Sequence, residues 1–227
     1  MELSIHRIRL GFVNSYLVCH SGAMLVDTGM SGSGEKILEG IRSLGYDPQQ
    51  LNLIVLTHGH ADHIGSACEL AKATGAQIAI HQADQSWLEQ GRFYPAQPVT
   101  AWARLMARLT ARMQAQFTFP ACVPDIVLDD RPFSLEAFGI PGRITPTPGH
   151  TPGSVSVVLE DGSALVGDMA MNGFPSLKFH PGLPFAVQDL PGLLKSWQGL
   201  LDEPVKMICP GHGSPFPAEA MRKTVAG

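Results

Sequence analysis

The residues with the clearest capacity for chemistry form a short cluster of three histidines and one aspartate. His58, His60, Asp62 and His63 stand directly after the apolar run 51–57. Imidazole and carboxylate groups are costly to bury unless they are hydrogen-bonded, paired or bound to a metal. Neutral imidazole nitrogen and carboxylate oxygen are ligands that suit zinc, iron or manganese. The cluster therefore predicts a metal site.

The spacing within this cluster favours two neighbouring metals over one. Side chains at alternate positions of an extended segment point the same way, which applies to His58 and His60. Asp62 and His63 fall in the first turn of an expected helix, where they can face a neighbouring point. The cluster thus supplies ligands in two directions.

Three further residues with metal-binding side chains occur in the same context, a loop that follows an expected strand. His150 lies in T-P-G-H-T-P-G, Asp168 follows the apolar run 163–167, and His212 lies in C-P-G-H-G. Each of them alone is more often an ordinary loop residue than a ligand. Because α/β sheets bind their ligands at strand ends, all three together with the upstream cluster predict one shared site.

The elements that must position these residues alternate between strands and helices. Apolar runs and period-2 alternation predict strands, and 3.6-residue periodicity predicts helices. The expected strands are 3–10, 15–20, 23–27, 51–57, 77–81, 126–128, 143–147, 154–160, 163–167 and 205–209. The expected helices are 37–44, 62–74 and 188–201. The similar order in the two halves predicts two sheets packed against each other, with helices outside.

Taken in order over nearly the whole chain, these motifs resemble those of metallo-β-lactamase-fold, glyoxalase II-like hydrolases. The resemblance implies an α/β fold, a four-layer αββα sandwich. It also implies a dinuclear centre in which one aspartate bridges both metals. In that centre the first metal is held by His58, His60 and His150, the second by Asp62, His63 and His212, and the bridge is Asp168.

Asp27 matches the aspartate that this family carries at the end of an early strand. The resemblance implies that it orients a metal ligand by hydrogen bonding. An alternative of equal standing is a turn-forming aspartate before Thr28 and Gly29.

The chemistry implied is hydrolysis. Two divalent metals, zinc first with manganese or iron as alternatives, share a bridging hydroxide at neutral pH. Asp62 is the best-placed carboxylate to orient the nucleophile or to pass a proton. Asp168 argues against a true metallo-β-lactamase, which lacks an acidic bridge, and Met171 replaces the tyrosine of acyl-homoserine lactonases. The expected substrate is a small-molecule ester, thioester, lactone or phosphoester.

A second function is compatible with the same motifs. Persulfide dioxygenases of this superfamily keep these residues but use one iron. His58, His150 and Asp168 would then hold the iron of a mononuclear oxidoreductase.

Residues 82–124 interrupt the alternation of strands and helices. We expect a single domain, 1–227, in which this segment is a helical insertion. The insertion is either an amphipathic surface helix, a lid over the site or a homodimer contact. The residues expected to contact substrate at the rim, where ordinary loop packing is the alternative, are Met171, Phe174, Phe179 and His180.

Composition excludes several other classes of protein. A net charge of −4 argues against nucleic acid as a partner. No apolar run approaches the ~18 residues of a membrane span. The N-terminal residues lack the pattern of a secretory signal, so the expected location is cytoplasmic. In that compartment the four cysteines are expected to be buried, unpaired thiols.

Overall fold

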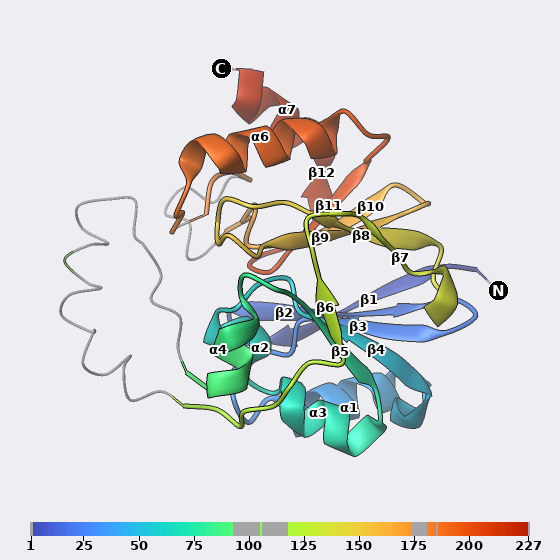
Figure 1. Ribbon diagram of the computed structural model, residues 1–227. Helices are drawn as coiled ribbons and strands as arrows, with labels where there is room; N and C mark the ends of the chain where they lie inside the picture. The colour runs from blue at the N-terminus through green and yellow to red at the C-terminus, as the bar shows by residue number, and fades with distance from the viewer. Residues whose placement is uncertain (1, 93–104, 106–117, 174–180, 185, 227) are drawn as a thin grey trace.

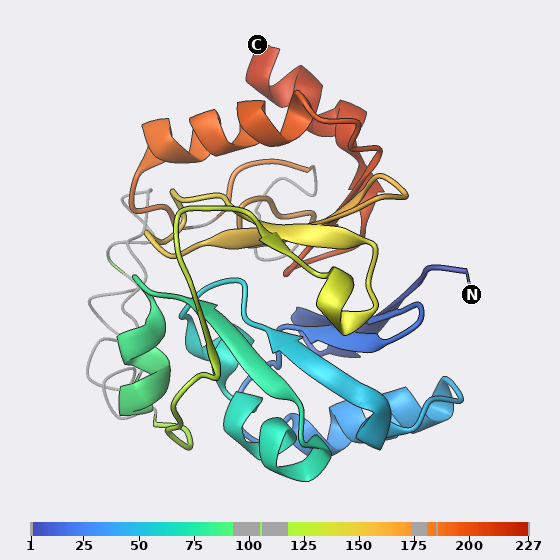
Figure 2. The same ribbon diagram turned by 45° about the vertical axis from the view of Figure 1, so that its right-hand side comes forward.

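The computed structural model describes residues 2–92, 105, 118–173, 181–184 and 186–226. Within this part of the chain the strands form two six-stranded sheets that lie face to face. Helices cover the outer face of each sheet (Figure 1 and Figure 2). The resulting order of layers is helix, sheet, sheet, helix, so the predicted αββα sandwich is confirmed.

The first sheet has the strand order β1-β2-β3-β4-β5-β6. Strand β2 runs antiparallel to both β1 and β3, and β3 to β6 run parallel to one another. The strands are β1 (Ser4–Leu10), β2 (Val13–Cys19), β3 (Ala23–Val26), β4 (Leu51–Val55), β5 (Gln77–His81) and β6 (Ile126–Leu128). Every strand expected before residue 130 is present, β5 and β6 with the expected bounds and the other four with shifted ends.

The second sheet has the order β12-β11-β10-β9-β8-β7. Only β10 and β11 are parallel neighbours, and the other pairs are antiparallel. Its strands are β7 (Phe133–Ser134), β8 (Gly142–Pro146), β9 (Val155–Leu159), β10 (Ser163–Gly167), β11 (Met207–Pro210) and β12 (Phe216–Pro217). The two-residue strands β7 and β12 were not expected, because so short a segment has no periodicity to detect.

Two helices cover each sheet on its outer side. Helices α1 (Gly34–Ser43) and α3 (Ala67–Thr74) cover the first sheet, and α6 (Leu190–Leu201) and α7 (Ala218–Ala226) cover the second (Figure 1). The short helices α2 (Ala61–Ile64) and α4 (Gln85–Gln90) follow strands β4 and β5. No helix within the described residues is long and apolar enough to cross a membrane.

Three apolar cores hold the layers together. Leu53 and Val55 of β4 face the core between the sheets, whereas Ile54 and Leu56 face the core under α1 and α3. Strand β4 is therefore buried on both faces, as its continuous apolar run predicted. The third core lies between the second sheet and α6, where the indole of Trp197 is fully buried.

The helix expected over 62–74 is broken into α2 and α3. At the break, the Gly65 amide donates a hydrogen bond to the carbonyl oxygen of Gly29 at 2.9 Å. A Cβ on Gly65 would lie 2.3 Å from the backbone nitrogen of Ser31, so only glycine allows this approach. The close backbone contact ends α2 after one turn, and the sequence periodicity did not reveal it.

The expectation that all four cysteines are unpaired is wrong for two of them. Cys68 in the first turn of α3 forms a disulfide with Cys122, 54 residues later, at a Cα–Cα distance of 5.8 Å. The backbone at Cys122 lies against α4, because the Cys122 amide donates a hydrogen bond to the carbonyl oxygen of Leu88 at 3.4 Å. Cys19 and Cys209 are free and buried, as expected. Stable disulfides are rare in reducing compartments, so this pairing weighs against the expected cytoplasmic location.

Reduction of the Cys68–Cys122 bond is expected to lower the free energy of unfolding by about 2–4 kcal/mol, because it releases a long loop in the unfolded chain. Denaturant titrations with and without reductant measure the change, and the Cys68→Ser variant should not respond to reductant. Alkylation in denaturant should modify two cysteines before reduction and four after it. Four modified cysteines before reduction would contradict the pairing.

Candidate metal centre

Five of the seven predicted ligands lie in loops that follow strands of the two sheets, and Asp62 and His63 lie in the short helix α2. The segment from His58 to His63 follows β4 and runs into α2. His150 follows β8, Asp168 follows β10 and His212 follows β11. The two sheets thus contribute ligands from opposite sides, which explains why residues more than a hundred positions apart come together.

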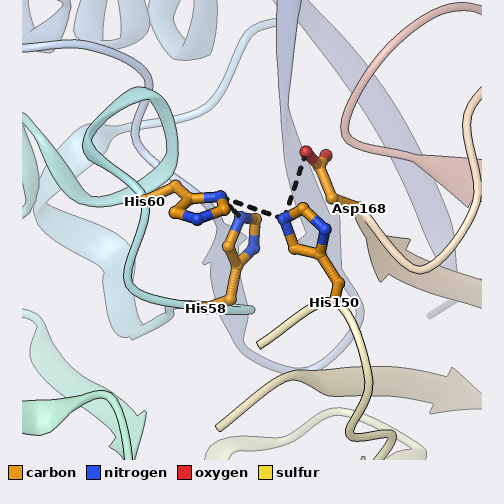
Figure 3. A group of neighbouring side chains, drawn as sticks. All are labelled: His58, His60, His150 and Asp168. Atoms are coloured by element: carbon orange, nitrogen blue, oxygen red, sulfur yellow. Dashed lines mark hydrogen bonds and ion pairs between the residues drawn. The ribbon is translucent and has the colours of Figure 1, made fainter. Parts of the chain in front are cut away.

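The first group contains His58, His60, His150 and Asp168, whose ligand atoms all lie within 4.8 Å of one another. Figure 3 shows the three imidazole rings and the carboxylate pointing toward one another. Nδ1 of His60 lies 3.0 Å from Nε2 of His58 and 2.9 Å from Nε2 of His150. All four side chains are buried.

The second group contains Asp62, His63 and His212, also within 4.8 Å of one another. Nε2 of His212 lies 3.3 Å from Oδ2 of Asp62 and 3.4 Å from Nε2 of His63. Asp168 belongs to both groups in space. Its Oδ1 is 3.3 Å from Nε2 of His63, and its Oδ2 is 3.3 Å from Nε2 of His212 and 3.6 Å from Nε2 of His150.

Hydrogen bonds donated by the outer ring nitrogens fix the tautomers of two histidines. Nδ1 of His150 donates to the carbonyl oxygen of Ala186 at 2.7 Å. Nδ1 of His212 donates to the carbonyl oxygen of Phe12 at 2.9 Å. Because a carbonyl oxygen can only accept, each Nδ1 carries the proton, and the inward Nε2 of a neutral ring carries a lone pair.

Asp27 and Thr57 fix two more rings in the same way. Nδ1 of His63 donates to Oδ2 of Asp27 at 2.8 Å. The Thr57 hydroxyl donates its one hydrogen to Asp27 at 2.8 Å, so it accepts from Nδ1 of His58 at 3.1 Å. Asp27 also has a φ of 62°, which aspartate tolerates better than most residues. The hydrogen bond from His63 is the contact that the orienting role requires, whereas residues 27–29, which are all described, form no turn.

These tautomers leave lone pairs facing one another across short distances. With neutral rings, no ring hydrogen lies between Nε2 of His63 and Nε2 of His212. In the first group, Nδ1 of His60 has at most one hydrogen for two facing nitrogens, those of His58 and His150. Facing lone pairs repel unless a cation lies between them. The nitrogen and oxygen donors therefore fit divalent metals such as zinc, manganese or iron.

The three histidines of the first group are neutral without metal. Burial, reinforced by neighbouring histidines, holds the pKa of His58 well below its ordinary value and lowers the pKa of His60 to about 3. Burial also lowers the pKa of His150. These rings therefore hold no extra proton at neutral pH.

The second group carries protons instead. Burial acts to lower the pKa of His212, but the Asp168 and Asp62 carboxylates outweigh it and raise that pKa to about 10. The same balance, with Asp168 and Asp27 dominant, raises the pKa of His63 well above its ordinary value. Burial opposes ionisation of Asp62, but the charge of His63 lowers its pKa to about 2. The second group is thus an ionised cluster at neutral pH.

Asp84 is a buried residue of the site that the sequence analysis missed. Its Oδ2 accepts from the Gly59 amide at 2.8 Å and from the Thr151 hydroxyl at 2.7 Å. Its Oδ1 accepts from the Gly153 amide at 3.0 Å. A Cβ on Gly153 would lie 2.6 Å from the Asp84 carboxylate. Asp84 therefore joins the loop of His58 to the loop of His150. Its place after β5 was the available signal.

Of the four expected substrate contacts, Met171 is the one that lies within the described residues. Met171 is buried, and its amide donates to the carbonyl oxygen of Gly182 at 3.1 Å. Phe174, Phe179 and His180 lie outside the described residues, as does most of the expected insertion. The proposed rim is therefore left as a prediction.

The sandwich with a histidine and aspartate cluster between its sheets defines a class of metal-binding α/β proteins. The chain belongs to the metallo-beta-lactamase superfamily, whose sequence model matches residues 8–212. The fold and the cluster together indicate divalent-metal binding. The predicted family is confirmed.

Relatives of the chain carry names that agree with this class. It is 31% identical to the uncharacterized protein YobT of Bacillus subtilis (strain 168), over 94% of this chain and 89% of that protein. It is 28% identical to the probable metallo-hydrolase YflN of the same organism, over 71% of this chain and 62% of that protein. Of these two names, that of YflN supports a hydrolase.

Solved structures share the fold. The BLEG-1 B3 metallo-beta-lactamase matches with a TM-score of 0.74 at 22% identity, over 99% of this chain and all of that one (100%). BJP-1, a subclass B3 metallo-beta-lactamase of Bradyrhizobium japonicum, matches with a TM-score of 0.66 at 22% identity, over 98% and 87% of the two chains. At this identity the likeness shows the fold and does not transfer the substrate.

Replacing Asp84 by Asn is expected to weaken metal binding at the first group by about 10–100-fold, because the amide oxygen can occupy only one of the two carboxylate oxygen positions and the NH2 group then faces the amide N–H of Gly59 or Gly153. Competition with a chromophoric chelator measures the affinity, and thermal unfolding monitors the fold. The matched control is Asp161→Asn at the β9–β10 turn, where the carboxylate accepts from Ser163 far from the ligands. Wild-type affinity in the Asp84 variant would contradict its role.

Metal binding near pH 7 is expected to release few protons at the first group and about one to two at the second. The sign follows from the pKa values: His60, at about 3, is already neutral, whereas His212, at about 10, must lose a proton to bind metal. The second group's affinity should therefore rise with pH and fall on acidification. Calorimetry in buffers of different ionisation enthalpy counts the protons, and equal release at both steps would be the contrary result.

Proposed function

We propose that the chain is a dinuclear metal-dependent hydrolase of a small-molecule ester, thioester, lactone or phosphoester. The observation that carries the proposal is the place of Asp168, whose two oxygens face histidines of both groups. In this assignment His58, His60 and His150 would hold one metal, Asp62, His63 and His212 would hold the second, and Asp168 would be a ligand shared by both.

When bound, two zinc ions, with manganese or iron as alternatives, would supply a hydroxide at neutral pH and polarise the oxygen of the scissile group. The chain's own residues orient the predicted ligands. Asp27, Thr57 and the carbonyl oxygens of Ala186 and Phe12 hold the imidazole rings in the tautomers that ligation requires.

Asp62 is the residue proposed to act on the reacting atoms. Its side chain is 21% exposed, whereas that of Asp168 is 5% exposed. With a pKa of about 2 it is ionised at neutral pH, so it can accept a hydrogen bond from the attacking water and orient it. Passing on a proton is the second role proposed for it.

Other parts of the proposal rest on the composition and the family. The partner is a small molecule rather than nucleic acid or a membrane, and a homodimer through residues 82–124 is part of the same hypothesis. The cytoplasmic location also stays a proposal, and the Cys68–Cys122 disulfide weighs against it.

The alternative is a mononuclear iron oxidoreductase in which His58, His150 and Asp168 hold the iron. The observation that favours it is that the first group alone offers a complete set of three histidines and one carboxylate. The second group, which would then have no metal to hold, favours the hydrolase.

The test is elemental analysis of protein purified without chelator or added metal, followed by assays on ester, thioester, lactone and phosphoester substrates. About two equivalents of zinc or manganese, with hydrolysis that a chelator abolishes, would support the proposal. About one equivalent of iron, with oxygen uptake in the presence of a persulfide, would overturn it in favour of the alternative.

The role of Asp62 is tested within the same assays. Asp62→Asn should reduce turnover by about 100-fold or more on the best substrate, with a melting temperature close to that of the wild type. Asp161→Asn is the control for loss of one carboxylate and should leave turnover unchanged. Near-normal turnover in Asp62→Asn would remove Asp62 from the reaction.

A further inference from the structure

A pocket of about 330 Å³ lies next to the second group, at the edge of the sandwich formed by β1. Its walls include Arg7 and Arg9 of β1, Phe12 of the β1–β2 turn, and Asn172 and Ser214 of the second sheet's loops. Nothing in the metal centre described above uses the two arginines.

The two arginines face the same way for a simple geometric reason. They are two residues apart on one strand, and the register pairs Arg7 with Tyr16 and Arg9 with Asn14 of β2. Tyr16 belongs to the core between the sheets, so this face of β1 looks toward the second sheet. Two guanidinium groups thus converge on one pocket.

These guanidinium groups lack the carboxylate partners that four other arginines of the described residues have. Arg42, Arg131, Arg143 and Arg222 each pair with a carboxylate. In the part of the chain that the structure describes, neither Arg7 nor Arg9 has a carboxylate within 4.0 Å. The contact found for Arg7 is a hydrogen bond from Nη1 to the carbonyl oxygen of Gly213 at 3.1 Å. Unpaired positive charge in a chain of net charge −4 is a local feature of this pocket.

The pocket is directly connected to a predicted metal ligand. The ring of Phe12 stacks on the ring of His212, with a centroid distance of 5.7 Å and an interplanar angle of 1°. Asn14 donates to the carbonyl oxygens of Pro210 and Gly213 on either side of this histidine, at 3.0 and 2.7 Å. A group bound by the arginines would therefore lie beside the second group.

We propose that Arg7 and Arg9 form a subsite for an anionic group of the substrate, a carboxylate or a phosphate, separate from the bond that is cleaved. The proposal rests on the proposed hydrolase function and narrows its substrate class. Guanidinium groups bind both anions through paired, charge-assisted hydrogen bonds, which neutral substrates cannot form. The scissile bond would lie at the metals while the remote anion is held at β1.

The experiment uses pairs of 4-nitrophenyl esters of equal chain length, one ending in a methyl group and the other in a carboxylate, over a series of lengths. We expect the metal-loaded wild type to show a lower KM for the carboxylated ester of at least one pair. Arg9→Gln should reduce this advantage about tenfold, mainly in KM rather than kcat. Arg7→Lys, which keeps the charge and loses the fork, should reduce it less than Arg7→Gln.

The matched control is Arg131→Gln, which removes an exposed arginine at the opposite edge of the sheets, between β6 and β7. It should leave the KM ratio of each pair unchanged. An absent preference in the wild type, or the same preference in Arg9→Gln and Arg7→Gln as in the wild type, would overturn the subsite.

Failure of the subsite and failure of the hydrolase proposal give different results. Hydrolysis of both esters without a carboxylate preference removes only the subsite. If neither ester is hydrolysed, calorimetric binding of inorganic phosphate and of the free dicarboxylates tests the pocket independently. Binding about tenfold weaker in Arg9→Gln would support the subsite, and equal binding in both proteins would overturn it.

Discussion

Repulsion between the lone pairs of facing imidazole nitrogens is the constraint on which the centre of this protein depends. Carbonyl and carboxylate acceptors outside the centre hold the ring hydrogens of His63, His150 and His212. In the first group, whose rings are neutral, Nδ1 of His60 faces Nε2 of His58 at 3.0 Å and Nε2 of His150 at 2.9 Å with at most one hydrogen for the two contacts. A metal cation relieves this repulsion, whereas in the second group the protons of His63 and His212 relieve it while no metal is bound. The carbonyl and carboxylate acceptors around the centre therefore preorganise the ring nitrogens for metal binding.

Two buried carboxylates hold the loops against this repulsion. Asp27 accepts from the Thr57 amide at 2.8 Å as well as from His63, and it joins the ends of β3 and β4. Asp84 joins the loop after β4 to the loop after β8, across the two sheets. Burying a carboxylate is costly unless it is hydrogen-bonded. Asp27 accepts hydrogen bonds from the amide and hydroxyl of Thr57 and from His63, and Asp84 accepts them from Gly59, Thr151 and Gly153. Their negative charge also favours cations nearby, so the groups that fix the loops also serve the metals.

The sequence predicted what depends on local pattern and order, and missed what depends on contact across the chain. The strands, the sandwich and the seven clustered side chains followed from apolar runs and from motifs at strand ends. Asp84 was missed because its three partners lie on two distant loops, and the Cys68–Cys122 pair because 54 residues separate its members. The break at Gly65 was hidden because helical periodicity says nothing about a backbone packed against the helix.

The two groups of the centre differ in a way that indicates where a substrate enters. The first group is enclosed, and its side chains are at most 6% exposed, the highest value being that of His60. In the second group Asp62 is 21% exposed, and the pocket of Arg7 and Arg9 adjoins His212. The more exposed predicted ligand, Asp62, and the unpaired arginines Arg7 and Arg9 thus lie on the side of the second group. Positive charge at an entrance raises the local concentration of anions, so an anionic substrate would approach from the second group's side, where the proposed proton acceptor Asp62 lies.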